Sequence, residues 1–505
     1  MIYYQEDSDS RFFTIEAGTM TAADLDAILT AVEQTAVEVY IVEVNAQQAN
    51  YPSSCYDHYL EGFDAAAGIH QPVLGPNATP WAYRRRANMQ VLFNQGIDSN
   101  AYLLDGMRKR GRKPWLGIRM NDIHDGHDPS SSIHGRFWKE HPELRISELS
   151  CENGYDYSYA KVRDYHLNFI TEALMRYNAD GILLDWLRWP TFFPPGTGEE
   201  RAPLLTDFMA RVKTAVEQAA KAHGHKIELA CRVPFRPERA LARGLDAVEW
   251  GKRGYLDQLI LGTFGSSLSF DPPVEQWQKA IGKADLPIIV SLGEGYWNTP
   301  TLPLERYPIT PEVGRGLAAE AYYRGAKGIH CFNFQGFHRR EKLRPTAEIL
   351  LQELSSPELF QQKPRTHLLH WDDSALRVYE LDRFFLEKGF GERWLAEHRK
   401  NHTYPAALPR EINPGGTAEF SLCCGSIRPG LKQATLEVEA SGAIDTINAA
   451  INKAPLQLIR CQDGFYRGNP PNEIMLDGWN WIEFRSTDKT MTLKKCMLHF
   501  EFSET

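Results

Sequence analysis

Apolar runs and helical patterns alternate along the first two thirds of the chain. Eight short apolar runs are candidate strands. They are Phe12–Ile15, Val37–Val44, Trp115–Met120, Gly181–Trp186, Ile227–Val233, Leu256–Leu261, Pro287–Leu292 and Gly328–Phe334. Between such runs the apolar residues recur every three or four positions, as Leu25, Ile28, Leu29 and Val32 do, which is the spacing of an amphipathic helix. Strands that alternate with helices predict βα units around a parallel sheet.

The number of candidate strands favours one parallel architecture over another. Eight strands with intervening helices match a (β/α)8 barrel, which carries its active site at the carboxyl ends of the strands. A doubly wound open sheet is the alternative, but the sequence lacks the GxGxxG and GxxxxGK[ST] motifs that bind phosphates in such sheets. It also lacks GxSxG and HExxH, which excludes a hydrolase elbow and a zincin helix. We therefore predict an α/β fold with a TIM-like barrel over residues 1–350.

The pattern changes after residue 350. Residues 351–404 are predicted to form a linker and a helical segment. Residues 405–505 contain short alternating runs separated by turn residues, which is typical of an all-β sandwich. These runs are Ala418–Cys423, Ala434–Glu439, Leu456–Cys461, Trp479–Ser486 and Thr492–Phe502. A barrel followed by a β-sandwich is common among carbohydrate-active enzymes, which suggests a glycosidase by analogy.

Charge and hydropathy argue against several kinds of partner. The formal net charge is −9, and the longest cationic runs, such as Arg84–Arg86, have three residues, so the basic stripe of a nucleic-acid-binding protein is missing. No apolar window of about 18 residues is present, so we expect no membrane-spanning helix. The acidic start of the chain lacks the apolar core of a secretory leader, which predicts the cytoplasm. The eight cysteines are expected to be reduced thiols.

Polar residues that follow barrel strands are the candidate catalytic residues. The strand ends supply carboxylates, arginines, amides and one histidine. The densest group is Arg119, Asn121, Asp122 and His124. The others are Glu16, Asn45, Asp185, Arg188, Arg232, Glu294, Asn333 and Gln335. Carboxylates and histidine exchange protons and arginine binds anions, so this collection favours acid–base hydrolysis with an anion clamp.

Several of these residues have two interpretations. His124 next to Asp122 is a candidate cationic acid, or it caps the loop. Arg119 binds a carboxylate ligand, or it pairs with Asp122 or Asp185. Asp185 and Glu294 are candidates for the two carboxylates of a glycosidase. Asp185 has an ion pair with Arg188 as its alternative, and Glu294 lies between glycines that allow a plain turn.

The loop after the third run also holds candidate metal ligands, namely Asp122, His124, His127 and Asp128. Histidine and carboxylate ligands occur in hydrolytic zinc sites. These residues are crowded into one loop, and no distant histidine completes the set. We therefore predict neither a metal nor another cofactor.

Together these segments resemble glycoside hydrolase family 156, the inverting exo-sialidases with a (β/α)8 barrel and a C-terminal β-rich domain. The resemblance rests on Arg119-Met120-Asn121-Asp122-Ile123-His124 after strand three, Asp185 to Arg188 after strand four, and Phe332-Asn333-Phe334 in strand eight. A looser similarity exists to barrel glycosidases that carry DGxxxDxxR.

The resemblance implies a role for each matching residue. His124 would be the Brønsted acid that protonates the glycosidic oxygen. Arg119 and Arg188 would hold the carboxylate of the sugar, and Asn333 would contact the substrate. In that family the base is an aspartate after strand one. In this chain the carboxylate that follows the predicted first strand is Glu16, so Glu16 is the expected base. The resemblance also implies a homodimer.

The other strand-end side chains are expected to line the substrate site. They are Asn45, Asn121, Asp122, Asp185, Glu294 and Gln335. Phe137, Trp138, Trp189, Phe192 and Phe193 are expected to form an apolar wall around the aglycone, with packing in the core as the alternative.

The chemistry of a sialic acid, or of a related 2-ulosonic acid, fits this arrangement. Its anomeric carbon carries a carboxylate, which would repel a second carboxylate acting as nucleophile. A carboxylate that activates water avoids this contact and gives inversion in a single displacement. Two other hypotheses stay open: a non-catalytic sialic-acid-binding protein that has lost its base, and a retaining neutral-sugar glycosidase that uses Asp185 and Glu294.

Overall fold

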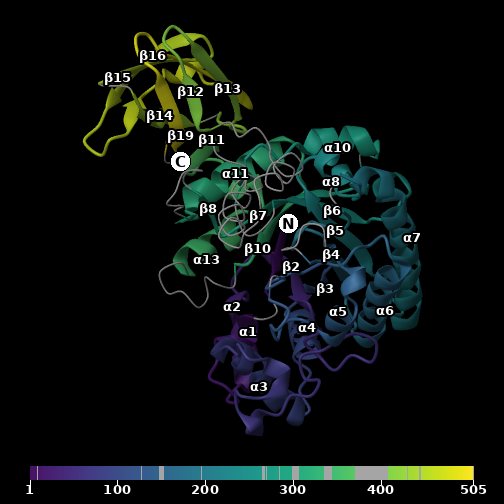
Figure 1. Ribbon diagram of the computed structural model, residues 1–505. Coiled ribbons are helices and arrows are strands. Elements are labelled where there is room, and N and C mark those ends of the chain that lie inside the picture. Colours follow the sequence, from purple (N-terminus) through teal and green to yellow (C-terminus); the bar gives the residue numbers. More distant parts are fainter. Residues whose placement is uncertain are drawn as a thin grey trace.

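The computed structural model describes most of the chain as a barrel and a second, antiparallel sheet (Figure 1). The described residues are 1–7, 10–126, 128–146, 153–194, 196–263, 268, 270–283, 285–297, 306–334, 344–369, 408–428, 430–442 and 445–503.

Eight parallel strands close into a barrel in the order β1-β10-β7-β6-β5-β4-β3-β2. They are β1 (Ile2–Gln5), β2 (Val37–Glu43), β3 (Lys113–Arg119), β4 (Gly181–Asp185), β5 (Glu228–Pro234), β6 (Gln258–Gly262), β7 (Ile288–Leu292) and β10 (Gly328–Phe332). The register pairs Arg119 with Asp185 and Asp185 with Arg232, so these residues lie at one level of the barrel mouth. The predicted fold class is confirmed.

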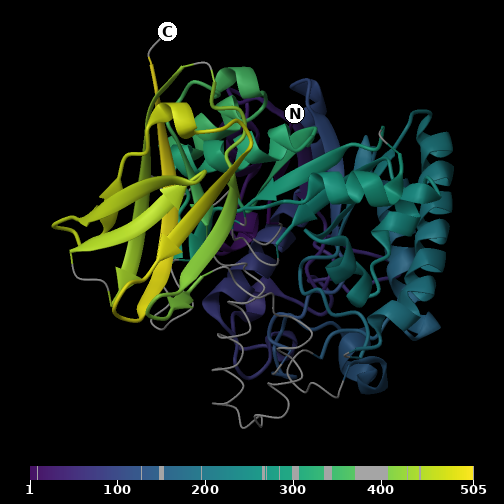
Figure 2. The same cartoon turned by 90° about the horizontal axis from the view of Figure 1, so that it is seen from above.

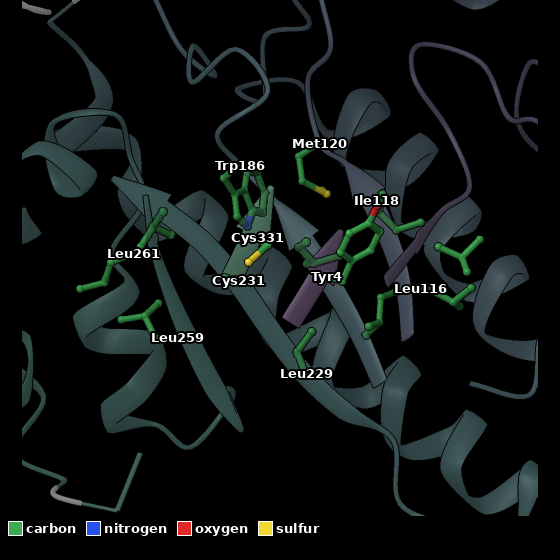
Figure 3. Packing of buried hydrophobic residues seen from close by; sticks show 14 of the residues in the cluster. Tyr4, Leu116, Ile118, Met120, Trp186, Leu229, Cys231, Leu259, Leu261 and Cys331 are labelled. Carbon is green, nitrogen blue, oxygen red and sulfur yellow. The ribbon is translucent and has the colours of Figure 1, made fainter. Parts of the chain in front are cut away.

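The barrel strands are buried on both faces, which explains their continuous apolar runs. Ala230 and Ile260 belong to the cluster that fills the inside of the barrel. Their neighbours Leu229, Cys231 and Leu259 pack outward against the helices (Figure 3). The alternation along each strand thus separates two apolar layers.

Helices cover the outside of the barrel (Figure 1). They are α1 (Ser10–Phe13), α2 (Ala22–Ala31), α3 (Pro80–Asn94), α4 (Ser99–Lys109), α5 (Arg136–Glu140), α6 (Ala160–Arg176), α7 (Gly198–His223), α8 (Pro237–Ala242), α9 (Ala247–Lys252), α10 (Val274–Ile281), α11 (Pro311–Tyr323) and α13 (Arg344–Glu353). A short hairpin of β8 (Gly295–Trp297) and β9 (Arg306–Pro308) follows β7. Within the described ranges, none of the helices combines the length and the apolar character needed to cross a bilayer.

The prediction for the first strand is wrong. Residues Ser10–Phe13 form helix α1, and the first strand is Ile2–Gln5, which pairs with β10 and β2. Four residues buried on both sides are too few to show a period, and an acidic segment follows them at once. Glu16 therefore follows a helix and is exposed, so it is not at the end of strand one. The carboxylates in that place are Glu6 and Asp7.

The C-terminal sheet has the order β11-β19-β14-β17-β16-β15-β18-β13, and β12 also pairs with β19. Its strands are β11 (Arg365–Leu369), β12 (Arg410–Ile412), β13 (Thr417–Cys423), β14 (Leu431–Ser441), β15 (Thr446–Ile451), β16 (Ala454–Arg460), β17 (Tyr466–Gly468), β18 (Trp479–Arg485) and β19 (Met491–Phe502). The five predicted runs are confirmed as strands of an antiparallel, sandwich-like domain with its own apolar core. β11 joins this sheet from within the predicted linker, and residues 370–404 of that linker lie outside the described residues.

The sheet packs beside the barrel on the side away from α7 (Figure 2). The contact is close, because a side chain at Gly316 of α11 would collide with the backbone carbonyl of Thr366 in β11. Cys423 and Cys424, next to this contact, are both buried thiols, and the described cysteines form no disulfide.

A buried arginine joins the two parts. Arg324, at the end of α11, lies 3.1 Å from the carboxylate of Glu320 and 2.6 Å from that of Glu275, and its guanidinium lies 5.1 Å from the ring centre of Trp479 in the sheet. Burial raises the pKa of Glu320 to about 8 against the attraction of Arg324. Arg324 therefore offsets part of the cost of burying the Glu320 carboxylate at this junction.

We expect Arg324→Ala to cost about 3 kcal/mol of unfolding free energy, because it leaves Glu320 buried without its cation. The raised pKa means that the folded chain holds a proton that the unfolded chain releases above the ordinary value of 4.5, so stability falls as pH rises toward about 8. Urea denaturation at both ends of this range measures the effect, and the deficit should be larger at the alkaline end. Arg344→Ala, which removes an exposed pair with Glu348, is the matched control and should change stability by less than about 0.5 kcal/mol.

Candidate active site

Buried polar side chains meet at the carboxyl ends of β1, β2, β4 and β5. Asp185 accepts hydrogen bonds from Nη1 of Arg232, at 3.2 Å and 3.1 Å from its two oxygens. Nε2 of Gln5 donates to Oδ2 of Asp185 at 3.1 Å and to Oε1 of Glu43 at 2.5 Å. Oε1 of Gln5 lies 2.8 Å from Nε2 of His330. Asp185 thus binds Arg232 and Gln5, and the ion pair with Arg188 that the sequence offered is not formed.

His330 is neutral in this network. Burial, aided by the charge of Arg232, holds its pKa well below the ordinary value. Because Nε2 of Gln5 donates to two carboxylates, Oε1 of Gln5 accepts the Nε2 proton of His330, and Nδ1 of His330 then accepts from the hydroxyl of Ser291 at 2.9 Å. The hydrogen-bond roles of the Gln5 amide are therefore fixed.

Arg119, the last residue of β3, binds carboxylates of its own chain. Nε and Nη2 contact Oε2 of Glu43 at 2.8 Å and 2.6 Å. Nη1 donates to Asp122 at 2.8 Å, and Nη2 donates to Asp7 at 2.9 Å. The side chain is only 2% exposed. The sequence predicted a clamp for a substrate carboxylate, and the structure shows Arg119 at the centre of an internal ion-pair network.

Asp122 connects this network to His124. Its Oδ1 lies 2.5 Å from Nδ1 of His124 and accepts from the backbone N–H of the same residue at 3.0 Å. Burial would raise the pKa of Asp122, but His124, Arg119 and Arg188 together hold it well below the usual range. The imidazole is 43% exposed, and its edge lies against Trp189 at 5.6 Å between ring centres. Because Nδ1 faces Asp122, Nε2 is the nitrogen left for proton exchange with a ligand.

Arg188 differs from the other arginines of the mouth. It is 9% exposed, and its guanidinium lies 5.1 Å from the ring centre of Phe332. In the part of the chain that the structure describes, no carboxylate lies within ion-pair distance of it, and its Nε has no hydrogen-bond partner. Glu43 and Asp122 act on it only at longer range. A buried cation without a partner is unfavourable unless an anion joins it, so Arg188 is suited to bind one.

Asn333, directly after β10, shows two features of a binding residue. Its φ of 60° is a left-handed conformation that side chains other than glycine adopt at a cost. Its Oδ1 is buried and has no hydrogen-bond partner within the described ranges. The amide is therefore available to a ligand group. Gln335, predicted with it, lies outside the described residues.

Two predicted contact residues hold the backbone instead. Oδ1 of Asn45 accepts from the N–H of Arg119 at 3.0 Å, and its Nδ2 donates to the carbonyl of Arg119 at 3.1 Å, which ties the end of β2 to the end of β3. Asn121 makes the same pair of bonds with Tyr155, each at 3.0 Å. Both amides are buried and bonded to the chain, so we correct their expected role to that of loop anchors.

The predicted aromatic wall is largely wrong. Trp138, Phe192 and Phe193 are buried and belong to the core. Phe137 stacks on a tyrosine of α6 at 4.0 Å between ring centres. Trp189, which touches the imidazole described above, is the member of this set that reaches the site. Phe192 packs on Trp186, and Phe193 packs against Gly244.

The described residues give little support to a catalytic role of Glu294 or to a metal site. Glu294 is half-buried after β7, and its carbonyl accepts from Ile309. Asp128 accepts from its neighbour Ser130, and Asp122 from Arg119, so these predicted ligands face different partners. His127 lies outside the described residues, and among those described no group of three histidine, cysteine or acidic residues has metal-site geometry.

Sequence reasoning missed Asp7, Glu43 and Gln5. Glu43 is the polar residue near the end of the apolar run of β2, which is a signal that the pattern contained. Burial raises its pKa to about 7, with Arg119 opposing the shift and Asp7 adding to it. Asp7 and Gln5 were hidden because the first strand was placed too late in the chain.

Comparison with known proteins identifies no family. No protein-family model matches the chain, and no curated protein matches it. Among solved structures, similarity extends to a Paenibacillus sp. cycloisomaltooligosaccharide glucanotransferase, with 10% identity and a TM-score of 0.35 over 98% of this chain and 57% of that one. The PgaB (BpsB) glycoside hydrolase domain from Bordetella bronchiseptica has 11% identity and a TM-score of 0.41 over 70% and 98%. The endo-beta-1,4-mannanase from Thermotoga petrophila has 11% and 0.38 over 93% of both. Similarity at this level carries no argument about function, and the chain spans little more than half of the glucanotransferase.

Proposed function

We propose that the barrel is a glycoside hydrolase that acts on a sugar bearing a carboxylate. The observation that carries this proposal is Arg188, a buried guanidinium without an ion-pair partner among the described residues, close to the His124–Asp122 pair. An anion bound there would neutralise the charge of Arg188. The amide oxygen of Asn333 would accept a hydrogen bond from a hydroxyl or an amide N–H of the ligand.

The neighbouring groups suit acid–base hydrolysis with inversion. His124 gives its Nε2 proton to the glycosidic oxygen as the bond breaks. Asp7, which follows β1 and is partly exposed, removes a proton from the attacking water. Neither group bonds to the anomeric carbon, which suits a centre that already carries a negative carboxylate.

Asp7 also strengthens the resemblance to glycoside hydrolase family 156. That family is expected to use an aspartate after strand one as its base, and Asp7 follows β1. We therefore propose an exo-sialidase-like enzyme that releases a terminal sialic acid or a related 2-ulosonic acid. The homodimer that the resemblance implies stays a prediction for sedimentation analysis.

The two alternatives lose support. The non-catalytic interpretation assumed a missing base, and Asp7 supplies a carboxylate in that place. The retaining interpretation needs Asp185 as a nucleophile or acid, yet Asp185 is buried and bonded to Arg232 and Gln5.

A panel of aryl glycosides, neutral and ulosonic, tests the proposed function. Proton NMR during the first turnovers should show release of N-acetylneuraminic acid from an α-sialoside as the β anomer. Cleavage of neutral hexosides alone, or first release of the α anomer, would contradict the proposal.

Replacement of Arg188 by methionine should weaken binding more than turnover. Loss of a charge-assisted pair of hydrogen bonds costs about 3 kcal/mol, so we expect KM for a sialoside to rise about 100-fold with a smaller change in kcat. Steady-state kinetics measure this split. Arg136→Met, at an exposed arginine of α5, is the control and should leave KM unchanged. An unchanged KM in the Arg188 variant would contradict the proposal that Arg188 binds the substrate carboxylate.

A further inference from the structure

One cation connects the proposed acid to the proposed base. Nη1 of Arg119 binds Asp122, which orients His124, and Nη2 binds Asp7. Asp7 and Asp122 are anions that repel each other, so a guanidinium between them lowers the cost of keeping them close. The guanidinium of Arg119 therefore positions the base, Asp7, directly and the acid, His124, through Asp122.

Glu43 binds the Nε–Nη2 edge of the same guanidinium and sets its plane. Oε2 of Glu43 accepts hydrogen bonds from both Nε and Nη2 of the guanidinium, and this two-point contact resists rotation of the guanidinium. Oε1 of Glu43 receives Nε2 of Gln5, whose orientation is fixed by His330 and Asp185. This chain of bonds anchors Glu43 to β1, β4 and β10.

We propose that Glu43 is a positioning residue, which fixes Arg119 so that Asp7 and His124 keep the separation that hydrolysis needs. This inference rests on the proposed function and assigns Arg119 to organisation of the site, while Arg188 binds the substrate carboxylate. Glu43 touches neither the substrate nor the reacting atoms. Its burial is tolerated because Arg119 and Gln5 bond both of its oxygens.

Glu43→Gln tests the anchor with little change of shape. If the new amide turns its oxygen to Arg119, its N–H groups oppose the N–H of Gln5. If it turns its oxygen to Gln5, the N–H groups oppose Arg119. One side of the anchor is lost in either orientation.

We expect Glu43→Gln to lower kcat on an aryl sialoside about 100-fold, the cost of a misplacement of about 1 Å, with less than a threefold change in KM. Glu43→Asp keeps the charge and should recover about tenfold of this loss. Glu320→Gln, at a buried carboxylate paired with an arginine away from the mouth, is the control for the general cost of such a change and should keep kcat. A wild-type kcat in Glu43→Gln, or a rise in KM as large as the loss of kcat, would overturn the inference.

A second measurement separates this inference from the proposed function. In the ligand-free protein, the Nε–H proton of Arg119 should exchange slowly with solvent in NMR spectra, and Glu43→Gln should remove this protection while Glu320→Gln keeps it. Protection that survives in Glu43→Gln would contradict the anchor whether or not any glycoside is cleaved. If the wild type is inert toward every sialoside, the proposed function fails, and the loss of protection still decides whether Glu43 anchors Arg119.

Discussion

Asp7→Asn is expected to lower kcat for sialoside hydrolysis about 1000-fold, while Glu16→Gln is expected to leave it unchanged. Asparagine keeps the shape of Asp7 but cannot accept a proton from water, and the contribution of a general base lies in this range. Glu16 is exposed beyond α1, so it is the matched control for a carboxylate-to-amide change near the start of the chain. Steady-state kinetics on an aryl sialoside give both values.

The pair of variants separates two assignments of the base. Asp7 also binds Arg119, so the thermal midpoint of Asp7→Asn should be compared with the wild type to show that the fold is intact. Loss of activity in Glu16→Gln together with full activity in Asp7→Asn would restore the assignment that the sequence suggested and contradict the one based on the structure.

His124→Ala is expected to have the second large effect, and its size should depend on the leaving group. An alkyl alcohol must be protonated as it leaves, so kcat for an alkyl sialoside should fall about 1000-fold. A nitrophenolate leaves without being protonated, so kcat for a nitrophenyl sialoside should fall about tenfold or less. The two substrates assayed side by side provide the measurement.

His141→Ala is the control for His124, because His141 lies beyond α5 next to Glu143 and outside the site. It should retain activity on both substrates. An equal loss on both substrates in His124→Ala would indicate a structural role for the imidazole, and no loss on the alkyl sialoside would remove it as the acid.

The sequence predicted the barrel because its central strands are buried on both faces. Apart from Asp185 and Ser291 near their ends, the runs Gly181–Trp186 and Pro287–Leu292 contain no polar residue, which is the pattern of parallel strands covered by helices. Ile2–Gln5 follows the same rule over four residues, which is too short for any period to emerge. Because the strand was placed too late, the carboxylate expected after it was Glu16 instead of Asp7.

The site was predictable where its residues are local in sequence. Arg119, Asp122 and His124 follow one strand, and the structure keeps them in contact. Whether a polar strand-end residue faces a ligand or the backbone depends on neighbours far along the chain, as the bonds of Asn45 to Arg119 show. The aromatic residues were misjudged for a similar reason, since residue type does not distinguish an exposed platform from a buried ring such as that of Phe192.

The anion site at Arg188 is tested by comparing an aryl α-sialoside with its C1 methyl ester, which lacks the negative charge that Arg188 is proposed to bind. We expect kcat/KM for the acid to exceed that for the ester by at least about 100-fold, because a charged partner of a buried guanidinium contributes about 3 kcal/mol. Equal kcat/KM values for the acid and the ester would contradict the proposed anion site.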